Sequence, residues 1–412
     1  MKSNQNKNAL LILILGALTA LSPFSIDMYL PAFQKMATAF GTGVSEVSLS
    51  LSSYFVGLAV GQLFYGPLLD RFGRKKPLYV GLVLYILATI GCLMSTSIEG
   101  LIAFRFLQAI GGCAANVASV AMVRDLFTAK ESAKVFSLLM LILGVSPLVA
   151  PTAGGYLASV FGWQAVFISL GIIGALMLVV SFTYLPESHK PDASQSLRPG
   201  PIIKDYLEIL KNPQFYTYTF AGALAFSGLF VYVAGSPIIF MEIFQVSERT
   251  YGWIFAGLAV GFVGASQLNL VLLKKFSNEQ ILLGSLMILV ITGLSFFIGA
   301  FNNWYGIGGT IGTLFLFLSC VGLANPNGAA LALAPFAKDA GKASALMGSL
   351  QMGTGALASV AVGVLKAQQI FPIAAVFASS ALLALGILIF GNRRMTEKVE
   401  VSSDETSAAI AH

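Results

Sequence analysis

The chain is 412 residues long, and 57% of its residues are hydrophobic whereas only 10% are charged. Soluble domains carry roughly a quarter charged residues, so this composition excludes an ordinary soluble protein. The net charge of +6 does not require a nucleic-acid partner. In a membrane protein, the side on which lysine and arginine lie matters more than their number.

Apolar runs of roughly 20 residues, the length that crosses a bilayer, follow one another along the chain between short polar segments. We predict an all-α integral membrane protein with about twelve transmembrane helices. The expected spans are 9–31, 46–69, 77–96, 100–123, 135–160, 163–185, 214–240, 250–273, 280–300, 304–333, 343–366 and 371–391. We expect the first run to be retained as a helix, because it is long and lacks a clear small-x-small cleavage site.

Lysine and arginine are unevenly distributed over the predicted topology. Placing the N-terminus in the cytoplasm leaves only Lys35, Arg249 and Lys366 on the opposite side, with Arg105 inside a span. The positive-inside rule therefore supports an even number of spans and cytoplasmic N- and C-termini.

The longest polar interruption, 186–213, is rich in proline and charge and separates two sets of six spans. We predict an N-terminal six-helix half over 1–185, a cytoplasmic linker over 186–213, a C-terminal six-helix half over 214–391, and a disordered cytoplasmic tail over 392–412. Within the linker, the apolar residues from Ile202 to Leu210 follow helical spacing. This spacing favours a short helix on the membrane surface, and the alternative is a disordered loop.

A short sequence in the first half recurs in the second half. Phe55-Val-Gly-Leu-Ala-Val-Gly61 in the second span recurs as Phe255-Ala-Gly-Leu-Ala-Val-Gly261 in the eighth. These spans run in the same direction, so the repeats are parallel, although apolar segments also resemble one another by chance. Two parallel six-helix halves that rock about a site at the membrane midplane form one large class of secondary transporters.

Two charged residues stand inside apolar runs. Asp27 lies near the end of the run from Ala9 to Leu30, and Arg105 lies near the start of the run from Leu101 to Met122. Charges at this depth are costly and usually mark a transport pathway. If the two helices are antiparallel, both charges lie in the same half of the membrane, where they can pair. The alternative is that Asp27 is solvated at the outer interface and that Arg105 snorkels there.

Burial favours the neutral acid of Asp27, whereas a nearby Arg105 favours the carboxylate, so a modest rearrangement could switch its protonation. A deprotonated Asp27 would pair with Arg105 or with a cationic substrate, and a proton entering from outside would release either partner. The histidines, His189 and His412, lie in the linker and the tail. Asp27 and Arg105 are therefore the candidate residues for proton coupling.

Two further motifs complete the pattern. The loop after the second span is a dense charge cluster in which Asp70 could latch onto an arginine or a helix N-terminus; its candidate gating residues are Gly66, Asp70, Arg71, Gly73 and Arg74. The fifth span combines helix-bending prolines with glycines that permit close helix approach; its residues are Gly144, Pro147, Pro151, Gly154 and Gly155. An ordinary proline-kinked packing helix is the alternative for this span.

Together with Leu101-x-x-x-Arg105-x-x-Gln108-x-x-Gly111, these strings resemble the major facilitator superfamily over essentially the whole chain. The fifth span resembles the antiporter signature of its proton-coupled drug exporters, and Ser25-Ile-Asp27-Met-Tyr-Leu-Pro31 resembles their first helix. The subfamily that the chain resembles is the bicyclomycin and chloramphenicol resistance group, Bcr/CflA. The second half departs from the pattern: Lys274 replaces the acidic residue, and Gly348 to Gly355 keeps glycines without paired prolines.

A substrate pocket is expected between the halves, lined by aromatic residues with a few polar groups. For any single aromatic residue, core packing or lipid contact is the alternative. The candidates are Tyr29, Tyr54, Gln108, Asn116, Phe226, Phe230, Tyr232, Asn269, Asn325 and Gln351.

The resemblance implies a proton-coupled exporter of small amphipathic drug-like compounds such as antibiotics, working by alternating access as a monomer in contact with membrane lipid. We expect no cofactor besides the coupling proton and no metal, because Cys92, Cys113 and Cys320 all fall inside spans. No Gly-x-x-x-x-Gly-Lys-Ser/Thr loop is present, and no cluster of catalytic groups indicates an enzyme. The alternatives are a proton-driven uptake symporter and, from other classes, a channel or a non-transporting receptor.

Overall fold

The computed structural model describes residues 2–192, 199–336, 340–365, 369–395 and 399. It confirms the all-α prediction and contains twelve helices long and apolar enough to cross a membrane. The longer helices are α1 (Lys2–Asp27), α2 (Phe33–Phe40), α3 (Val44–Phe72), α4 (Lys75–Met94), α5 (Ile98–Leu126), α6 (Ala129–Phe161), α7 (Gln164–Tyr184), α8 (Pro199–Leu210), α9 (Pro213–Pro237), α10 (Glu248–Leu272), α11 (Asn278–Phe301), α12 (Ile307–Leu333), α13 (Ala340–Val364) and α14 (Ile370–Arg394).

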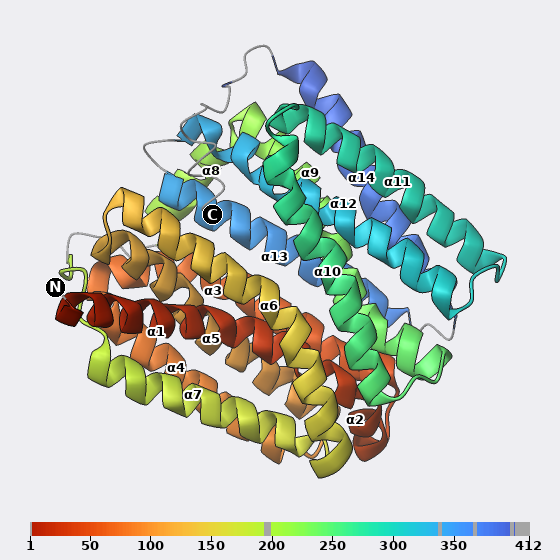
Figure 1. Ribbon diagram of the computed structural model, residues 1–412, viewed down its shortest axis with the longest axis horizontal. Coiled ribbons are helices and arrows are strands. Elements are labelled where there is room, and N and C mark those ends of the chain that lie inside the picture. Colours follow the sequence, from red (N-terminus) through yellow and green to blue (C-terminus); the bar gives the residue numbers. More distant parts are fainter. Residues whose placement is uncertain (1, 193–198, 337–339, 366–368, 396–398, 400–412) are drawn as a thin grey trace.

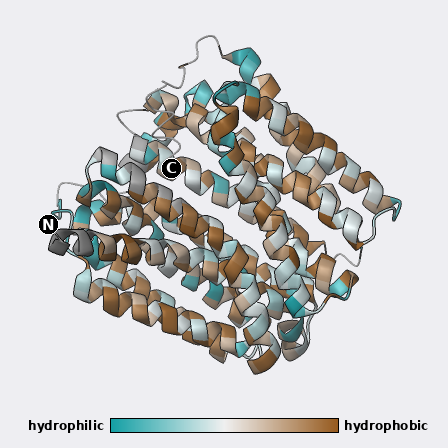
Figure 2. Ribbon diagram, in the orientation of Figure 1, coloured by the Kyte–Doolittle hydropathy of each residue, from teal (hydrophilic) through white to brown (hydrophobic). Residues whose placement is uncertain are grey.

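The spanning helices pack as two groups. In one, α1 contacts α5, α6 and α7, while α5 also packs on α3 and α4; in the other, α9 contacts α12, α13 and α14. The groups meet along two seams, α3 against α13 and α6 against α10 (Figure 1). Hydrophobic residues cover the outer helices, as Figure 2 shows. Large side chains such as Val80, Phe182 and Trp253 are each 69% exposed, as expected of surfaces that face lipid.

The bundle has two ends, which we name after residues that lie there. The Arg74 end carries the start of α1 and the loop between α3 and α4, and the Lys35 end carries α2 and the start of α10. At the Lys35 end the first span differs from the predicted 9–31: α1 stops at Asp27, and a 3-10 turn (η1, Leu30–Ala32) and α2 continue to Phe40. Pro31 explains part of this break, because proline has no N–H with which to continue a helix.

The linker and the tail are described in part. The short helix expected in the linker is present as α8, and its Asp205 pairs with Lys342 of α13 at 2.6 Å. Residues 193–198 of the linker lie outside the described residues, as do 396–398 and 400–412 of the predicted disordered tail. The start of that tail at 392 was placed too early, since α14 continues to Arg394. The described Val399 exchanges two backbone hydrogen bonds with the side chain of Gln214, each 2.9 Å long.

Polar groups join the two groups of helices at the α3–α13 seam. The hydroxyls of Ser52 and Ser359 lie 2.6 Å apart, and the Ser349 hydroxyl donates to the carbonyl of Ala59 at 3.1 Å. These hydroxyl side chains are small and let the two helices approach closely, and elsewhere in the same seam the larger Leu49 of α3 packs on Gly363 of α13. We call this the serine seam.

Candidate functional site

Arg105 is fully buried in α5 and is held by four contacts. Its Nη1 donates to Gln108 Oε1 at 2.5 Å, and its Nη2 donates to the carbonyl of Ser25 in α1 at 2.9 Å. The guanidinium lies between the rings of Tyr29 and Tyr54, with its Cζ 4.1 and 4.2 Å from their centroids. A guanidinium keeps its charge under all physiological conditions, and aromatic faces stabilise it where water is absent.

A chain of polar side chains extends this site into α4. Gln108 Nε2 donates to the Thr89 hydroxyl at 2.7 Å, and the Ser25 hydroxyl lies 2.7 Å from Tyr85 OH. Arg105 Nε and Tyr54 OH are buried without a hydrogen-bond partner. Four helices therefore converge on a single buried cation. The sequence predicted Arg105 and Gln108 as site residues but gave no indication of Thr89 or Tyr85.

We expect Arg105→Lys to lower the transport rate by at least about tenfold, although the charge is kept. Lysine has no planar fork to bond Gln108 and Ser25 while lying between two rings. Each hydrogen bond from a charged group contributes about 1.5–3 kcal/mol, enough for such a change. Transport assays on protein with an unchanged gel-filtration profile would measure this. Wild-type rates in the lysine variant would mean that charge alone is required.

Asp27 is not joined to Arg105 in this conformation. The carboxylate is buried in the structure, 5% exposed, and no ion pair or hydrogen bond of it occurs among the described residues. The turn that soon follows it, η1, contacts α9 and α10 of the other group of helices. Arg105 bonds the backbone carbonyl of Ser25, whereas the Ser25 hydroxyl lies beside Tyr85 of α4. Two residues along an α-helix turn the side chain by about 200°, so the Asp27 side chain points to the side of α1 opposite the Ser25 hydroxyl.

The two tyrosines near Asp27 differ in their bonding. Tyr251 OH lies 2.8 Å from the hydroxyl of Ser236, whereas Tyr232 OH is buried and has no hydrogen-bond partner. Tyr232 also stacks on Phe255 at 4.9 Å. The buried carboxyl group of Asp27 thus lies just before η1, the turn that contacts α9 and α10, and these two helices carry Tyr232 and Tyr251.

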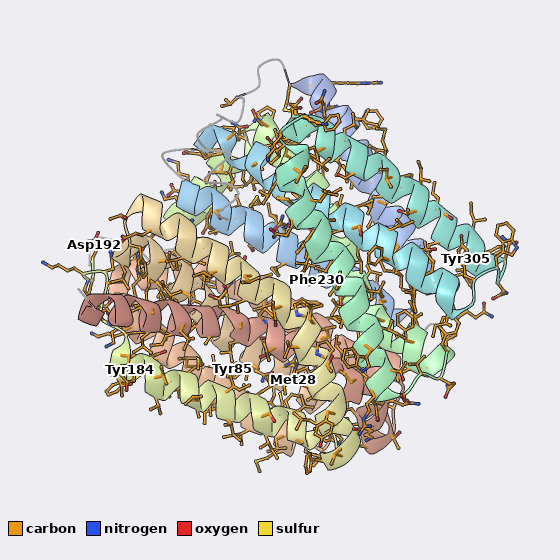
Figure 3. All side chains as sticks on the ribbon, viewed as in Figure 1. Met28, Tyr85, Tyr184, Asp192, Phe230 and Tyr305 are labelled. Atoms are coloured by element: carbon orange, nitrogen blue, oxygen red, sulfur yellow. The ribbon has the colours of Figure 1, made fainter. Side chains whose placement is uncertain are left out.

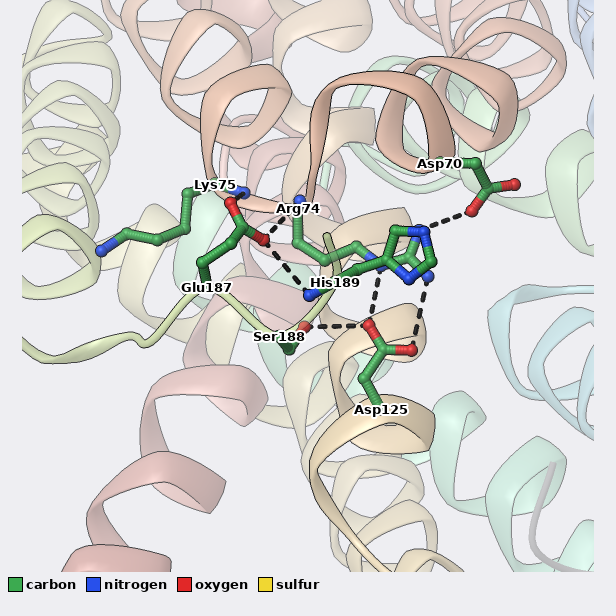
Figure 4. A network of polar contacts seen from close by, with 7 residues as sticks. All are labelled: Asp70, Arg74, Lys75, Asp125, Glu187, Ser188 and His189. Atoms are coloured by element: carbon green, nitrogen blue, oxygen red, sulfur yellow. Dashed lines mark hydrogen bonds and ion pairs between the residues drawn. The ribbon is translucent and has the colours of Figure 1, made fainter. Parts of the chain in front are cut away.

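The predicted gating loop forms an ion cluster around Arg74 (Figure 4). Its guanidinium bonds Asp70 Oδ1 at 2.7 Å and Asp125 of α5 at 2.8 and 3.3 Å. Burial opposes the charge, but the hydrogen bonds to Asp125 and Asp70 raise the pKa of Arg74 above its ordinary value. The predicted pairing of Asp70 with a neighbouring arginine is therefore present, while its role as a latch stays a prediction. Of the other loop residues, Gly73 adopts a φ of 82°, Gly66 faces open space, and Arg71 lies over the ring of Phe72.

The cluster includes residues that the sequence did not reveal. Glu187 follows α7 and accepts the backbone N–H groups of Arg74 and Lys75, at 2.7 and 3.1 Å, at the start of α4. Ser188 donates to Asp125 at 2.9 Å. The first residues of the linker therefore cap α4, since the side chain of its own N-cap residue, Arg74, makes no capping hydrogen bond.

Glu187→Ala is predicted to destabilise the folded protein by about 1 kcal/mol, the usual cost of removing a helix cap. The expected result is a lower melting temperature in detergent than that of wild type. Glu208→Ala is a suitable control, because Glu208 is an exposed side chain on α8. Equal melting temperatures for the two variants would contradict a capping role.

The predicted antiporter helix is α6, and it contacts both groups of helices. A Cβ at Gly154 would collide with the carbonyl oxygen of Met28, and one at Gly155 would lie 2.8 Å from the carbonyl oxygen of Glu248 in α10. Met28 is labelled in Figure 3. Pro147 and Pro151 both lie inside the helix. In return, a Cβ at Gly252 of α10 would lie 3.2 Å from the carbonyl of Pro151.

A lysine joins helices of the two groups at the Lys35 end of the bundle. Lys35 of α2 donates to the carbonyl of Ala158 near the end of α6 at 2.6 Å and pairs with Glu248 of α10 at 3.3 Å. Farther along α6, a Cβ at Gly144 would lie 3.1 Å from the side chain of Val263. The two groups of helices are therefore closed against each other at the Lys35 end.

The ten residues predicted to line a substrate pocket fall into separate clusters. Tyr29, Tyr54 and Gln108 surround Arg105, and Asn116 is half-buried farther along α5. Phe230 packs on Phe226 at 5.4 Å and on Phe55 of the other group at 4.4 Å.

The amides of the other helix group form two local pairs. Asn325 and Gln351 are bonded at 3.1 Å, while Asn269 accepts from Asn327 at 2.8 Å inside the second group of helices. None of the ten residues lines the surface groove between α4 and α7 or the surface groove between α10 and α12. A substrate role for these residues stays a prediction.

Comparison with known proteins agrees with this architecture. A family model described as Major Facilitator Superfamily matches residues 15–359. The chain is 32% identical over 388 residues to the bicyclomycin resistance protein homolog of Haemophilus influenzae, covering 94% of this chain and 97% of that one. It is 29% identical over 369 residues to multidrug resistance protein D of Escherichia coli, covering 87% and 90%.

The fold is shared with solved transporters. The crystal structure of a D-xylose-proton symporter matches 91% of this chain and 96% of its own, with a TM-score of 0.68 and 16% sequence identity. At this identity the likeness concerns the fold alone. The residues matched by the family model include Asp27, Arg105 and the Arg74 cluster, and the sequence relatives confirm the resemblance drawn from the motifs. The chain belongs to the major facilitator superfamily.

Proposed function

We propose that this protein is a proton-coupled multidrug exporter that moves small amphipathic compounds, such as antibiotics, across the bacterial inner membrane by alternating access. Its relatives named for bicyclomycin and multidrug resistance support this substrate class. The uneven distribution of lysine and arginine supports cytoplasmic termini, so that the Arg74 end faces the cytoplasm and the Lys35 end faces outward. Residues 1–185 and 214–391 would then move as two bodies.

The observation that carries the proposal is the position of Asp27. Its carboxyl group is buried and has no hydrogen bond or ion pair within the part of the chain that the structure describes, and it lies two residues from the Ser25 carbonyl that holds Arg105. The turn η1, which soon follows Asp27, contacts α9 and α10. The protonated carboxyl group is neutral and can remain buried near Tyr232 and Tyr251, whereas the deprotonated carboxylate is stabilised by a nearby cation. Rotation of the end of α1 would bring it toward Arg105, which is the pairing that the sequence suggested. Proton binding would therefore be linked to the state of the Lys35 end.

The test uses everted membrane vesicles that hold an inward proton gradient. Addition of an exported drug should release protons from vesicles containing the protein and not from vesicles prepared without it. A panel of amphipathic antibiotics, with bicyclomycin and chloramphenicol among them, provides the substrates. Drug accumulation that requires the gradient would support export. A folded protein that moves no compound in the panel, or that drives accumulation in right-side-out vesicles, would favour the uptake alternative.

A further inference from the structure

The side-chain amide of Gln108 lies between a donor and an acceptor. A guanidinium carries only N–H donors, so the Gln108 atom that Arg105 Nη1 contacts at 2.5 Å is the amide oxygen. The amide nitrogen then points the other way, toward α4, where it donates to the hydroxyl of Thr89 at 2.7 Å. The orientation of Gln108 is therefore set from both ends.

The hydroxyl of Thr89 can accept this bond because its own proton is engaged elsewhere. It donates to the carbonyl of Tyr85, one turn earlier in α4, at 2.6 Å. A hydroxyl oxygen that donates its proton still has lone pairs for an incoming N–H. The bonds thus run in one direction, from Arg105 through Gln108 and Thr89 to a backbone carbonyl. Turning the amide over would place two donors against each other, the amide nitrogen and the guanidinium.

Packing on two sides of α4 fixes the Thr89 side chain. Thr89 is 2% exposed, and a Cβ at Gly171 of α7 would lie 3.6 Å from its methyl group. On the side of α5 the helices approach through their backbones, since a Cβ at Gly111 would lie 2.6 Å from the carbonyl oxygen of Gly81. The methyl group of Thr89 therefore lies toward α7, and its hydroxyl lies toward Gln108 of α5.

Burial makes the threonine hydroxyl difficult to replace. Gln108 is fully buried, so bulk water does not reach its amide. A buried amide N–H that loses its acceptor is destabilised by the full cost of removing it from water. Rotation of the amide toward another acceptor would relieve that cost, but it would also carry the amide oxygen away from Arg105. Thr89 thus acts on the guanidinium through Gln108, without touching it.

We propose that Thr89 is a positioning residue for proton coupling: its hydroxyl fixes the amide of Gln108, which holds the guanidinium of Arg105 ready to receive the carboxylate of Asp27. The inference rests on the proposed function, in which Asp27 and Arg105 pair during the cycle. Nη1 and Nη2 of the guanidinium each hold a partner, whereas Nε is buried without one among the described residues. A donor therefore stays available for a carboxylate.

Two substitutions separate the hydroxyl of Thr89 from the rest of its side chain. Thr89→Val keeps the shape and loses the hydroxyl, whereas Thr89→Ser keeps the hydroxyl and loses the methyl group. Drug-triggered proton release per folded molecule should fall about tenfold in the valine variant, because a buried donor loses its partner. It should stay near the wild-type rate in the serine variant. Thr292→Val is the control, since Thr292 of α11 is also buried and its hydroxyl donates to carbonyls of its own helix.

A double-mutant cycle distinguishes positioning from a loss of stability. Gln108→Ala removes the amide through which Thr89 acts, so Thr89→Val should have no further effect in that background. A loss of stability would lower the rate again by the same factor. Equal losses in the two backgrounds, or in the valine and serine variants, would overturn the proposal, as would an equal loss in Thr292→Val. If Thr89→Val does not fold, Thr89→Ala removes the same hydroxyl.

Nuclear magnetic resonance of the full chain with isotope-labelled arginine tests the positioning without transport. The Nε–H signal of Arg105, identified by its loss in Arg105→Lys, should move in Thr89→Val and stay in place in Thr89→Ser and Thr292→Val. An unmoved signal in Thr89→Val would overturn the positioning role whatever the transport result. A moved signal in a chain whose wild type transports no drug would support the positioning of Arg105 and contradict the proposed function.

Discussion

Asp27→Asn is expected to reduce drug-triggered proton release in everted vesicles to the level of vesicles without the protein. Asparagine has almost the same shape as aspartic acid and cannot bind or release a proton. The asparagine side chain is neutral, as burial favours at this position, so we expect the stability of the folded protein to be unchanged. Drug binding should persist, because only the coupling step is removed. The rate of any residual drug movement should no longer depend on pH.

Glu99→Gln is the matched control for this change. Glu99 is an exposed carboxylate in the first turn of α5, on the same side of the membrane as Asp27. The chemical change is the same, but the group lies in water, so proton release should match that of the unmodified chain. Proton release that survives in a folded Asp27→Asn variant would assign coupling to another group. Loss in both variants would point to a general effect of charge at this surface.

Gly154→Ala is expected to hold the Lys35 end open. The added methyl group would meet a backbone atom, the carbonyl oxygen of Met28, which cannot move aside as a flexible side chain does. Overpacking of this kind costs about 1–3 kcal/mol. That would shift the balance between closed and open forms roughly five- to hundredfold. Transport should fall accordingly, because each cycle passes through the closed form.

Cysteine labelling measures this shift directly. Ser45 is buried near the start of α3, where its carbonyl lies beside Gly363 of α13, so Ser45→Cys reports opening at the Lys35 end. A membrane-impermeant maleimide should label it faster in the Gly154→Ala background. Gly144→Ala is the control, because its methyl group would lie 3.1 Å from the movable side chain of Val263. Equal labelling in all three backgrounds would show that α6 does not limit closure.

Helix number and the depth of the charges could be predicted from sequence because both depend on distance along the chain. A run of apolar residues has the length of a membrane, and depth follows from counting. Rotation about the helix axis could not be predicted in the same way. Asp27 and Ser25 differ little in depth, yet the Ser25 hydroxyl lies beside Tyr85 of α4, and the Asp27 side chain points to the opposite side of α1.

Contacts between residues far apart in sequence are the second feature of the site that could not be predicted. Asp70 and Arg74 are four residues apart, and their pairing follows from local helical geometry. Asp125 and Glu187 reach the same arginine from the ends of α5 and α7, and only the packing of those helices brings them together. The only signal in the sequence was that both are acidic residues at the ends of spans on the same side of the membrane.

The serine seam has a consequence for how the two groups of helices part. Hydroxyl groups lose little when a protein partner is exchanged for water, since a net hydrogen bond contributes only about 0.5–1.5 kcal/mol. The hydroxyls of Ser52, Ser349 and Ser359 can therefore exchange their protein partners for water, and back again, with little change in free energy. A seam of large apolar side chains would resist hydration and would behave as a permanent interface. An interface of small hydroxyl groups can open and close reversibly. The closed and open states then differ little in free energy, so that binding of a single proton can determine which of them is favoured.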